Sequence, residues 1–265
     1  MDATIYRNVP LDVHYGIPVF SVRNEYIENY ERISADHLKA YNKDSSNPFM
    51  AEHIWCAIEN STIEIISQYL KTNDTILDAG VGMGRLLSHF PQARRYGFDI
   101  SSGYLAMASK QGIEVCLSLI EDMPYKENYF DMVVCTDVLE HVLDLNAAVT
   151  NILRVLKDDG TFVLRVPYRE ELKCYLESTC PYEFVHLRNF DEHSLMLLFT
   201  RIFKCRVIKM TTAATFGPVL SNFRGAGLLS RMIRGVTVLF PEALASWIRT
   251  LMLKPLVINV VIRKY

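Results

Sequence analysis

A glycine-rich turn between a strand-like run and a helix-like run most constrains the fold of this chain. A short apolar run ends at Asp78, Gly80, Gly82 and Gly84 follow, and apolar residues then resume at helical spacing. The pattern predicts a strand, a tight turn and a helix. Glycines at alternate positions let the backbone bend and let a ligand approach the main chain. The GxGxG spacing differs from the GxGxxG of dinucleotide folds, so the turn alone leaves open a ligand cradle or a plain connection.

A second acidic residue ends the next predicted strand, residues 96–100. Asp99 closes this run, and Ser101 follows as the predicted N-cap of another helix. A carboxylate in this position of a βαβ unit can accept hydrogen bonds from both hydroxyls of a ribose. Together with the glycine turn, Asp99 therefore predicts a nucleoside-containing ligand, although a turn or cap residue is the simpler alternative.

The size and composition of the chain predict a globular protein with a large core. It has 265 residues, half of them apolar, and six scattered cysteines without a CxxC pair. Cysteines of this kind predict reduced thiols in the cytoplasm, and the Cys174 and Cys180 pair lacks partner ligands, so no metal site is expected. The first 16 residues lack a signal-peptide pattern, and no apolar run approaches about 18 residues. We therefore expect neither secretion nor a membrane span.

The N-terminal part is expected to precede the first strand of the sheet. Residues 1–20 carry prolines and a glycine and look irregular. Apolar and aromatic residues then recur at helical spacing over 26–41 and predict an amphipathic helix, whose Tyr26 and Tyr30 belong either to the core or to a lid that touches substrate. Asn47 and Pro48 predict a helix start, and Ser61 with Glu64 predicts a capping box that opens another helix.

Beyond Asp99 the sequence alternates between strand-like and helix-like segments. Strands are predicted at 113–117, 130–136, 161–166 and 203–210, and helices at 145–156 and from Asp191 to 199. This alternation predicts an α/β fold with a mostly parallel sheet and helices on both faces. Ligands of such sheets bind beyond the carboxyl ends of the strands, where the glycine turn, Asp99 and the segments 121–123, 136–141 and 167–170 all fall.

The motifs DAGVGMGR (78–85), GFDIS (97–101), EDMPY (121–125), DVLEH (137–141) and LRVLKDDG (153–160) follow one another along residues 70–210. In order and spacing they resemble the class I S-adenosylmethionine-dependent methyltransferases, in the branch that includes ubiquinone-pathway and natural-product enzymes. The resemblance implies a Rossmann-like sheet of seven strands, whose last strand, here 255–263, is antiparallel and inserted between the fifth and sixth. It also implies S-adenosyl-L-methionine as cofactor and S-adenosyl-L-homocysteine as product.

The same resemblance implies roles for the residues of the cofactor site. Asp78 and the three glycines would cradle the methionine part, Asp99 would bind the ribose, and Ile100 would lie against the adenine. Glu121, Asp122 and Met123 would border the far edge of the adenine. Thr136 would help to close the site around the sulfonium. Leu119 stands where relatives often have an aspartate, so the contact to the adenine amino group passes to Glu121, Asp122 or backbone carbonyls.

His141 is the candidate general base at the acceptor side. An imidazole can take a proton from a hydroxyl near neutral pH, and in relatives the Glu-His pair after the fourth strand borders the acceptor. The alternative is a histidine that shapes the pocket without moving a proton. Tyr168, Arg169, Glu170 and His186 follow the fifth strand and are further candidates for acceptor contacts, with surface solvation as the alternative.

Four parts are predicted: helices over 1–70, a cofactor-binding core over 71–211, an apolar basic insert over 212–254, and a final strand over 255–265. From 201 onward, eleven Lys or Arg accompany one acid, which gives +10, whereas the first 200 residues hold seventeen bases and twenty-nine acids, which gives −12. The insert is interpreted as a cap or homodimer contact, or as a peripheral membrane surface. A nucleic-acid partner is not expected.

We therefore predict O-methylation of a small-molecule or glycan-type acceptor. Two alternatives stay open at this point. One is N-methylation of a small amine, which needs no general base, and the other is a non-catalytic subunit that binds the cofactor or a partner.

Overall fold

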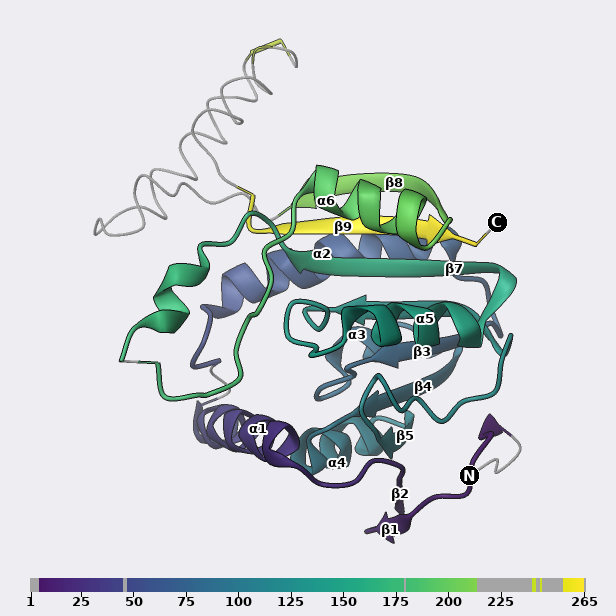
Figure 1. Ribbon diagram of the computed structural model, residues 1–265, viewed down its shortest axis with the longest axis vertical. Coiled ribbons are helices and arrows are strands. Elements are labelled where there is room, and N and C mark those ends of the chain that lie inside the picture. The colour runs from purple at the N-terminus through teal and green to yellow at the C-terminus, as the bar shows by residue number, and fades with distance from the viewer. Residues whose placement is uncertain are drawn as a thin grey trace.

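A single nine-stranded sheet organises the computed structural model (Figure 1). The structure describes residues 5–44, 47–178, 180–213, 240–241, 244 and 255–264. The strand order is β1-β2-β5-β4-β3-β6-β7-β9-β8. The strands are β1 Asp12–His14, β2 Ile17–Val19, β3 Thr75–Ala79, β4 Arg94–Asp99, β5 Glu114–Leu117, β6 Phe130–Thr136, β7 Leu156–Pro167, β8 Arg206–Ala213 and β9 Val257–Arg263.

The predicted topology of the sheet is confirmed. Strands β5, β4, β3, β6 and β7 pair in parallel, while β9 pairs antiparallel with both β7 and β8 and lies between them. The last strand of the chain is therefore inserted between the fifth and sixth strands of the core, as the resemblance implied. The sheet has two strands more than the seven expected.

Helices cover both faces of the sheet. Their bounds are α1 Glu25–Asp44, α2 Glu52–Tyr69, α3 Arg85–Ser88, α4 Ser102–Lys110, α5 Leu145–Val155 and α6 Glu192–Leu197, with a 3₁₀ helix at Leu172–Leu176 and a π-helix at Leu198–Ile202. Side chains of α5 and α6 share one buried cluster with Leu77 and Val133, whereas those of α2, α3 and α4 share another with Ile76 and Val134. Neighbouring residues of one strand thus point to opposite faces, as a β-strand requires.

The two additional strands form a hairpin at the N-terminus, where we predicted an irregular segment. Tyr15 and Gly16 have φ angles of 50° and 82° and form the tight turn between β1 and β2. Val19 of β2 pairs in parallel with Leu117, so the hairpin extends the sheet beyond β5. The prediction was wrong because three-residue strands are too short to show a period of two in the sequence.

The helix boundaries before β3 also differ from the prediction. A single helix, α2, begins at Glu52 and runs through Ser61 to Tyr69. Asn47 instead accepts a hydrogen bond from the backbone of Phe49 in a local turn, and the Ser61 hydroxyl donates to the carbonyl of Ile58 within the helix. Both residue types bond to nearby backbone in several contexts, so a cap pattern alone does not fix a helix start.

The other predicted caps are confirmed. Ser101 accepts a hydrogen bond from the backbone of Tyr104 at the start of α4, and Asp191 forms a capping box with Ser194 at the start of α6.

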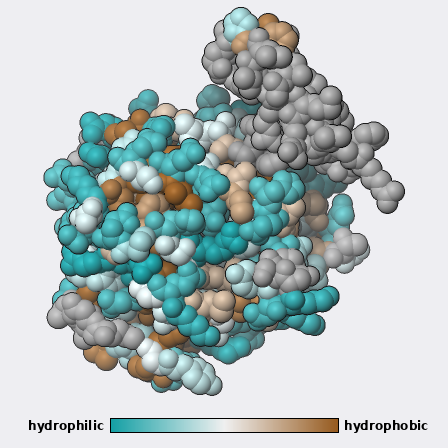
Figure 2. All heavy atoms as spheres, turned by 180° about the vertical axis from the view of Figure 1, so that it is seen from behind, coloured by the Kyte–Doolittle hydropathy of each residue, from teal (hydrophilic) through white to brown (hydrophobic). Residues whose placement is uncertain are grey.

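In the part of the chain that the structure describes, the helices lack the length and apolar character needed to cross a membrane. Figure 2 shows brown hydrophobic residues in small groups among teal hydrophilic ones on the face it presents.

Candidate active site

The turn between β3 and α3 exposes main chain to a large cavity. Gly80, Gly82 and Gly84 have φ angles of 91°, 51° and 82°, so all three are in conformations that favour glycine. A Cβ atom on Gly80 would lie 2.3 Å from Val138, and one on Gly84 would lie 2.7 Å from Ile113. A Cβ atom on Gly82 would meet no atom of the described residues within 4 Å. Gly80 and Gly84 therefore allow tight packing, and Gly82 leaves room for a ligand.

Asp99 ends β4 beside this turn and is held by two backbone groups. Its two carboxylate oxygens accept hydrogen bonds from the backbone N–H groups of Gly82 and Ser101, each at 2.9 Å. Burial raises the pKa of Asp99 to about 6, against the lowering effect of these bonds. Each oxygen has further lone pairs, so the carboxylate can still accept from two ligand hydroxyls.

Asp78 lies behind the turn as a buried carboxyl group. Only 2% of the residue is exposed, and its Oδ1 atom has no hydrogen-bond partner among the described residues. Burial raises its pKa well above the usual range, whereas the neighbouring charge of Arg165 acts in the opposite direction. A buried acceptor without a partner is unfavourable, and a ligand with a donor group in the turn would satisfy it.

A cavity of about 940 Å³ connects the turn with the segments that follow β6 and β7. Most of the predicted site residues line it: Tyr26, Tyr30, Gly80, Gly82, Asp99, Ile100, Glu121, Thr136, His141, Tyr168, Arg169 and His186. Four predicted residues lie outside the lining, namely Asp78, Gly84, Asp122 and Met123. Met123 is fully buried in the core, and the Asp122 carboxylate instead accepts a hydrogen bond from Ser21.

The stretch that would border an adenine combines a leucine and a glutamate. Leu119 and Glu121 both line the cavity. Glu121 accepts a weak hydrogen bond of 3.4 Å from the backbone of Asp144, and burial raises its pKa. Of the acceptors that the sequence left open, Glu121 faces the cavity and Asp122 does not.

His141 lies at the other end of the cavity, in the segment after β6. The hydroxyl of Tyr30, from α1, lies 2.8 Å from its Nδ1 atom. Burial, and after it the neighbouring His186, lower the pKa of His141 to about 3. The imidazole is therefore neutral near pH 7 and is a weak base in the ligand-free protein.

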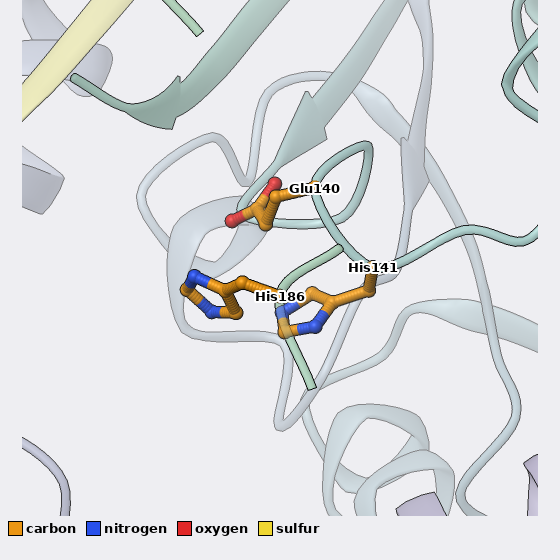
Figure 3. A group of neighbouring side chains, drawn as sticks. All are labelled: Glu140, His141 and His186. Atoms are coloured by element: carbon orange, nitrogen blue, oxygen red, sulfur yellow. The ribbon is translucent and has the colours of Figure 1, made fainter. Parts of the chain in front are cut away.

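A second histidine faces His141 from the segment between β7 and α6. The ring centroids of His141 and His186 lie 4.4 Å apart, and the rings are in an edge-to-face arrangement. His186 Nδ1 pairs with the carboxylate of Glu170, which also accepts a hydrogen bond of 2.9 Å from the hydroxyl of Tyr175. Figure 3 shows His141 and His186 beside the carboxylate of Glu140.

Tyr168 and Arg169 line the cavity, and their polar groups bind the start of α6. The Tyr168 hydroxyl donates to Glu192 at 2.6 Å, and the Arg169 guanidinium forms an ion pair with the same carboxylate at 3.2 Å. Burial, and after it the hydrogen bond to Glu192, raise the pKa of Tyr168 to about 12. Both residues thus help to hold the loop after β7 in place.

Sequence reasoning missed an ion pair between a buried arginine and a partly exposed aspartate at the site. Arg165, on β7, is only 5% exposed and binds the Asp137 carboxylate at 2.6 Å. It also donates to Thr62 of α2 at 2.9 Å. The signal available was an arginine inside an otherwise apolar strand, because such a residue needs a buried acid partner.

The predicted insert over 212–254 lies outside the described residues, apart from 212–213, 240–241 and 244. Its interpretations as a cap, a dimer contact or a membrane surface therefore stay predictions.

Comparison with known proteins finds a partial match to one family and a similar fold in solved structures. Residues 77–164 match a family model described as a methyltransferase domain. A solved structure of an S-adenosylmethionine-dependent methyltransferase from Thermotoga maritima superposes with a TM-score of 0.59, covering 90% of this chain and 99% of the other at 16% identity. At this identity the likeness shows the fold alone.

Sequence relatives match part of the chain. An uncharacterized protein of Methanocaldococcus jannaschii is 30% identical over 135 residues, half of this chain and 64% of the relative. The demethylmenaquinone methyltransferase of Symbiobacterium thermophilum is 30% identical over 150 residues, 51% of this chain and 58% of the relative. A tRNA (carboxymethyluridine(34)-5-O)-methyltransferase of Arabidopsis thaliana is 32% identical over 100 residues, 37% of this chain and 25% of the relative. The chain thus spans less than two thirds of the length of these relatives.

Proposed function

Because this chain contains a class I S-adenosylmethionine-dependent methyltransferase domain, we propose that it transfers the methyl group of S-adenosylmethionine to a hydroxyl oxygen of a small-molecule or glycan-type acceptor. The observation that carries this proposal is the shared cavity. Gly82 and Asp99 line it at one end, and Tyr30, His141 and His186 line it at the other. A cofactor and an acceptor can therefore meet inside one cavity, which is the main requirement for methyl transfer.

The residues at the glycine turn suit the cofactor. Among the residues that the structure describes, none fills the space at Gly82 and none bonds to the Oδ1 atom of Asp78, and Asp99 can accept from ribose hydroxyls. Asp78 would receive a hydrogen bond from the amino-acid part, and Ile100 with Leu119 would contact the adenine with apolar surface. Glu121 is the acidic candidate for the adenine amino group. When bound, S-adenosylmethionine supplies a methyl group that its sulfonium has already activated.

The chain's own contribution at the acceptor end is to orient a hydroxyl and to receive its proton. In the reaction the acceptor O–H bond breaks, a C–O bond forms, and the C–S bond breaks with its electron pair returning to sulfur. Neutral His141 can accept a hydrogen bond from the hydroxyl, with its ring oriented by Tyr30. Because its pKa is about 3, the proton passes on to the pair formed by His186 and Glu170 or to water.

A hydroxyl acceptor suits this end of the cavity better than an amine. Two imidazoles and a carboxylate gather where the acceptor would bind, and an amine that arrives without its proton needs no such group. Rings of Tyr26, Tyr30 and Tyr175 line the same end, which favours a sugar or an aromatic ring as the body of the acceptor.

Calorimetric titration with S-adenosylhomocysteine tests the cofactor site. We expect Asp99→Ala to weaken binding at least about 100-fold, because charge-assisted hydrogen bonds to two hydroxyls are lost. Asp122→Ala is the matched control, since its carboxylate binds Ser21 outside the cavity, and it should bind within about twofold of the wild type. Equal affinity in both variants would contradict the ribose role.

Transfer of labelled methyl groups to acceptors tests the reaction itself. Sugars, nucleotide-linked sugars, hydroxylated aromatic compounds and primary amines would be compared in one assay. We expect hydroxyl compounds to be methylated and amines not to be. Methylation confined to amines would favour the N-methyltransferase alternative, and cofactor binding without transfer to any class would favour a non-catalytic role.

A further inference from the structure

Glu140 is a buried carboxyl group that the proposed reaction does not use. The residue is fully buried, and neither carboxyl oxygen has a hydrogen-bond partner in another described residue. Asp137, three positions earlier, has its carboxylate satisfied by Arg165. A buried carboxyl group without donors is strongly unfavourable unless something else binds it. Both residues line the cavity, so a ligand from the cavity can reach Glu140.

Two imidazoles converge on this carboxyl group. One ligand atom from each of Glu140, His141 and His186 lies within 4.8 Å of the other two. Figure 3 shows the Glu140 carboxylate next to both rings, with Glu140 and His141 on one loop and His186 on another segment. Donor atoms of one ion at about 2.1 Å each lie at most about 4.2 Å apart, so side-chain rotation can close the remaining gap.

Each histidine also has a partner that orients its ring. The Nδ1 atom of His186 pairs with the Glu170 carboxylate, and that of His141 lies 2.8 Å from the Tyr30 hydroxyl. Metal-binding histidines characteristically have a carboxylate or another polar group on the second ring nitrogen, which fixes the ring and its tautomer. Because Nδ1 of His186 pairs with Glu170, Nε2 is the ring nitrogen of His186 that can bind an ion. His141 also has a hydrogen bond with the backbone of Val185, which it would exchange for an ion.

We propose that Glu140, His141 and His186 bind a divalent transition-metal ion at the acceptor end of the cavity. Two imidazoles and one carboxylate suit Zn²⁺, Mn²⁺, Fe²⁺ or Co²⁺, whereas Mg²⁺ and Ca²⁺ prefer oxygen ligands. Three protein ligands leave further coordination positions open, as in catalytic rather than structural sites. The open side faces the cavity, because all three residues line it.

The role of such an ion rests on the proposed function. A divalent ion lowers the pKa of a hydroxyl that coordinates it, so the acceptor would lose its proton near neutral pH without a strong base. The proton would pass to water, and the methyl transfer itself would balance as described above. The ion would also fix the position of the acceptor oxygen in front of the methyl group.

The site can be tested by titrating the chelator-treated protein with metal ions. Binding of Co²⁺ is monitored by visible absorption, and binding of Zn²⁺ by calorimetry. We expect one ion per chain and a Co²⁺ spectrum that indicates nitrogen ligands. Glu140→Gln and His186→Ala should weaken binding at least about 100-fold, and Glu170→Gln about 10- to 100-fold by releasing the ring of His186. Thermal unfolding without metal checks that each variant is folded, and Glu170→Gln alters no ligand directly.

A surface cluster provides the matched control. Asp191, Glu192 and His193 form a second group with ligand spacing, and His193 is largely exposed. His193→Ala should leave the stoichiometry and the affinity unchanged. Binding that disappears in His193→Ala, or that is equal in Glu140→Gln, His186→Ala and the wild type, would overturn the proposal, as would the absence of Co²⁺ and Zn²⁺ binding by the wild type.

Titration of the same samples with S-adenosylhomocysteine separates the two proposals. If the wild type binds S-adenosylhomocysteine but neither metal, the metal site fails and the proposed methyl transfer stands. If it binds one metal ion but no S-adenosylhomocysteine, the proposed function fails and the metal site stands.

Discussion

The two ends of the cavity are built in different ways. We call the end proposed for the cofactor the cofactor end, and the end proposed for the acceptor the acceptor end. The cofactor end is made of neighbouring residues of the chain, because Asp78, the glycine turn and Asp99 belong to one strand-helix-strand unit. Its polar contacts are mainly to backbone groups. The acceptor end joins side chains from α1, from the loop after β6 and from the segment between β7 and α6. It holds Glu140, whose carboxyl oxygens lack a hydrogen-bond partner in the described part of the chain, and a neutral histidine.

This difference has a physical consequence. A site made from backbone geometry is specified by short-range sequence, since glycine placement and strand ends determine it. A site made from converging side chains depends on how distant segments pack, so it can change its chemistry while the fold is kept. The following predictions examine whether the two ends are as independent as this comparison suggests.

The largest effect is expected from Arg165, which could join the two ends. It pairs with Asp137 and lies close enough to Asp78 to lower the pKa of that group. Arg165→Leu removes two charge-assisted hydrogen bonds to Asp137 and one hydrogen bond to Thr62, and it leaves buried Asp78 without its neighbouring positive charge. We therefore expect a loss of about 3–5 kcal/mol in the free energy of unfolding. Urea denaturation measures this loss. The control is Arg23→Ala, whose ion pair with Glu28 is exposed and should contribute less than about 1 kcal/mol.

Weaker binding of S-adenosylhomocysteine by Arg165→Leu while it is still folded would show that the ends share one electrostatic support. Unchanged stability would mean that Asp137 and Asp78 find other partners or take up protons at little cost.

Two glycines of the same turn are expected to separate folding from ligand binding. Gly80→Ala puts a side chain at a φ of 91° and against Val138, so we expect a loss of about 2–4 kcal/mol in the free energy of unfolding. Gly82→Ala meets no protein atom and should lower that free energy by only about 1 kcal/mol. Its methyl group would occupy ligand space, so the affinity for S-adenosylhomocysteine should fall at least about tenfold. Equal affinities of Gly82→Ala and the wild type would place the ligand elsewhere.

The fold could be predicted from the sequence to a large extent. Strand β6 was predicted with the bounds that the structure has, and β9 was placed between β7 and β8 by resemblance. Long apolar runs of this kind are distinctive because both faces of the sheet are buried. The hairpin of β1 and β2 was missed because its strands are short, and the start of α2 was misplaced because cap residues also form local turns.

The glycine turn and Asp99 could be predicted from the sequence, whereas the grouping of side chains at the acceptor end could not. Asp99 and Gly82 follow from a local motif, and the structure places them in contact. Glu140 and His186 are 46 positions apart, and only the fold brings them together. The ion pair of Arg165 and Asp137 likewise joins β7 to the residue that follows β6. Sequence alone shows that such residues exist, but not which of them meet.

The pH dependence of cofactor binding should distinguish the two ends. Burial raises the pKa of Asp99 from 3.8 to about 6 in the ligand-free protein, and only the charged form accepts from both ribose hydroxyls. The affinity for S-adenosylhomocysteine should therefore fall about tenfold between pH 7.5 and pH 5. Calorimetry at both pH values measures this change. In Asp99→Asn, which cannot titrate, the affinity should be low at both values and nearly independent of pH.

The charge state of Asp99 affects the free energy of unfolding in the opposite direction from the affinity: its contribution to stability is larger at low pH. Between pH 3.8 and about 6, folded Asp99 retains a proton that the unfolded chain has lost, so its contribution to the free energy of unfolding falls as the pH rises. His141 acts the other way: between about pH 3 and 6.5 the unfolded chain binds a proton that the folded protein does not, so its contribution rises with pH. An affinity for S-adenosylhomocysteine that stays constant down to pH 5 would contradict the charge state assigned to Asp99.

The smallest effect is expected from a single hydroxyl at the acceptor end. Tyr30 and Tyr26 both come from α1 and line the cavity. The hydroxyl of Tyr30 bonds to the ring of His141, whereas the hydroxyl of Tyr26 lies 3.4 Å from the backbone carbonyl oxygen of His141. Tyr30→Phe should change the imidazole nitrogen shifts of His141 in NMR spectra and lower the free energy of unfolding by about 1 kcal/mol, and Tyr26→Phe should alter neither much. Because both hydroxyls bond to His141 and not to the glycine turn or Asp99, neither variant should weaken binding of S-adenosylhomocysteine. If Tyr30→Phe weakened it as much as Gly82→Ala does, the acceptor end would help to shape the cofactor end, and the two could not be treated as separate sites.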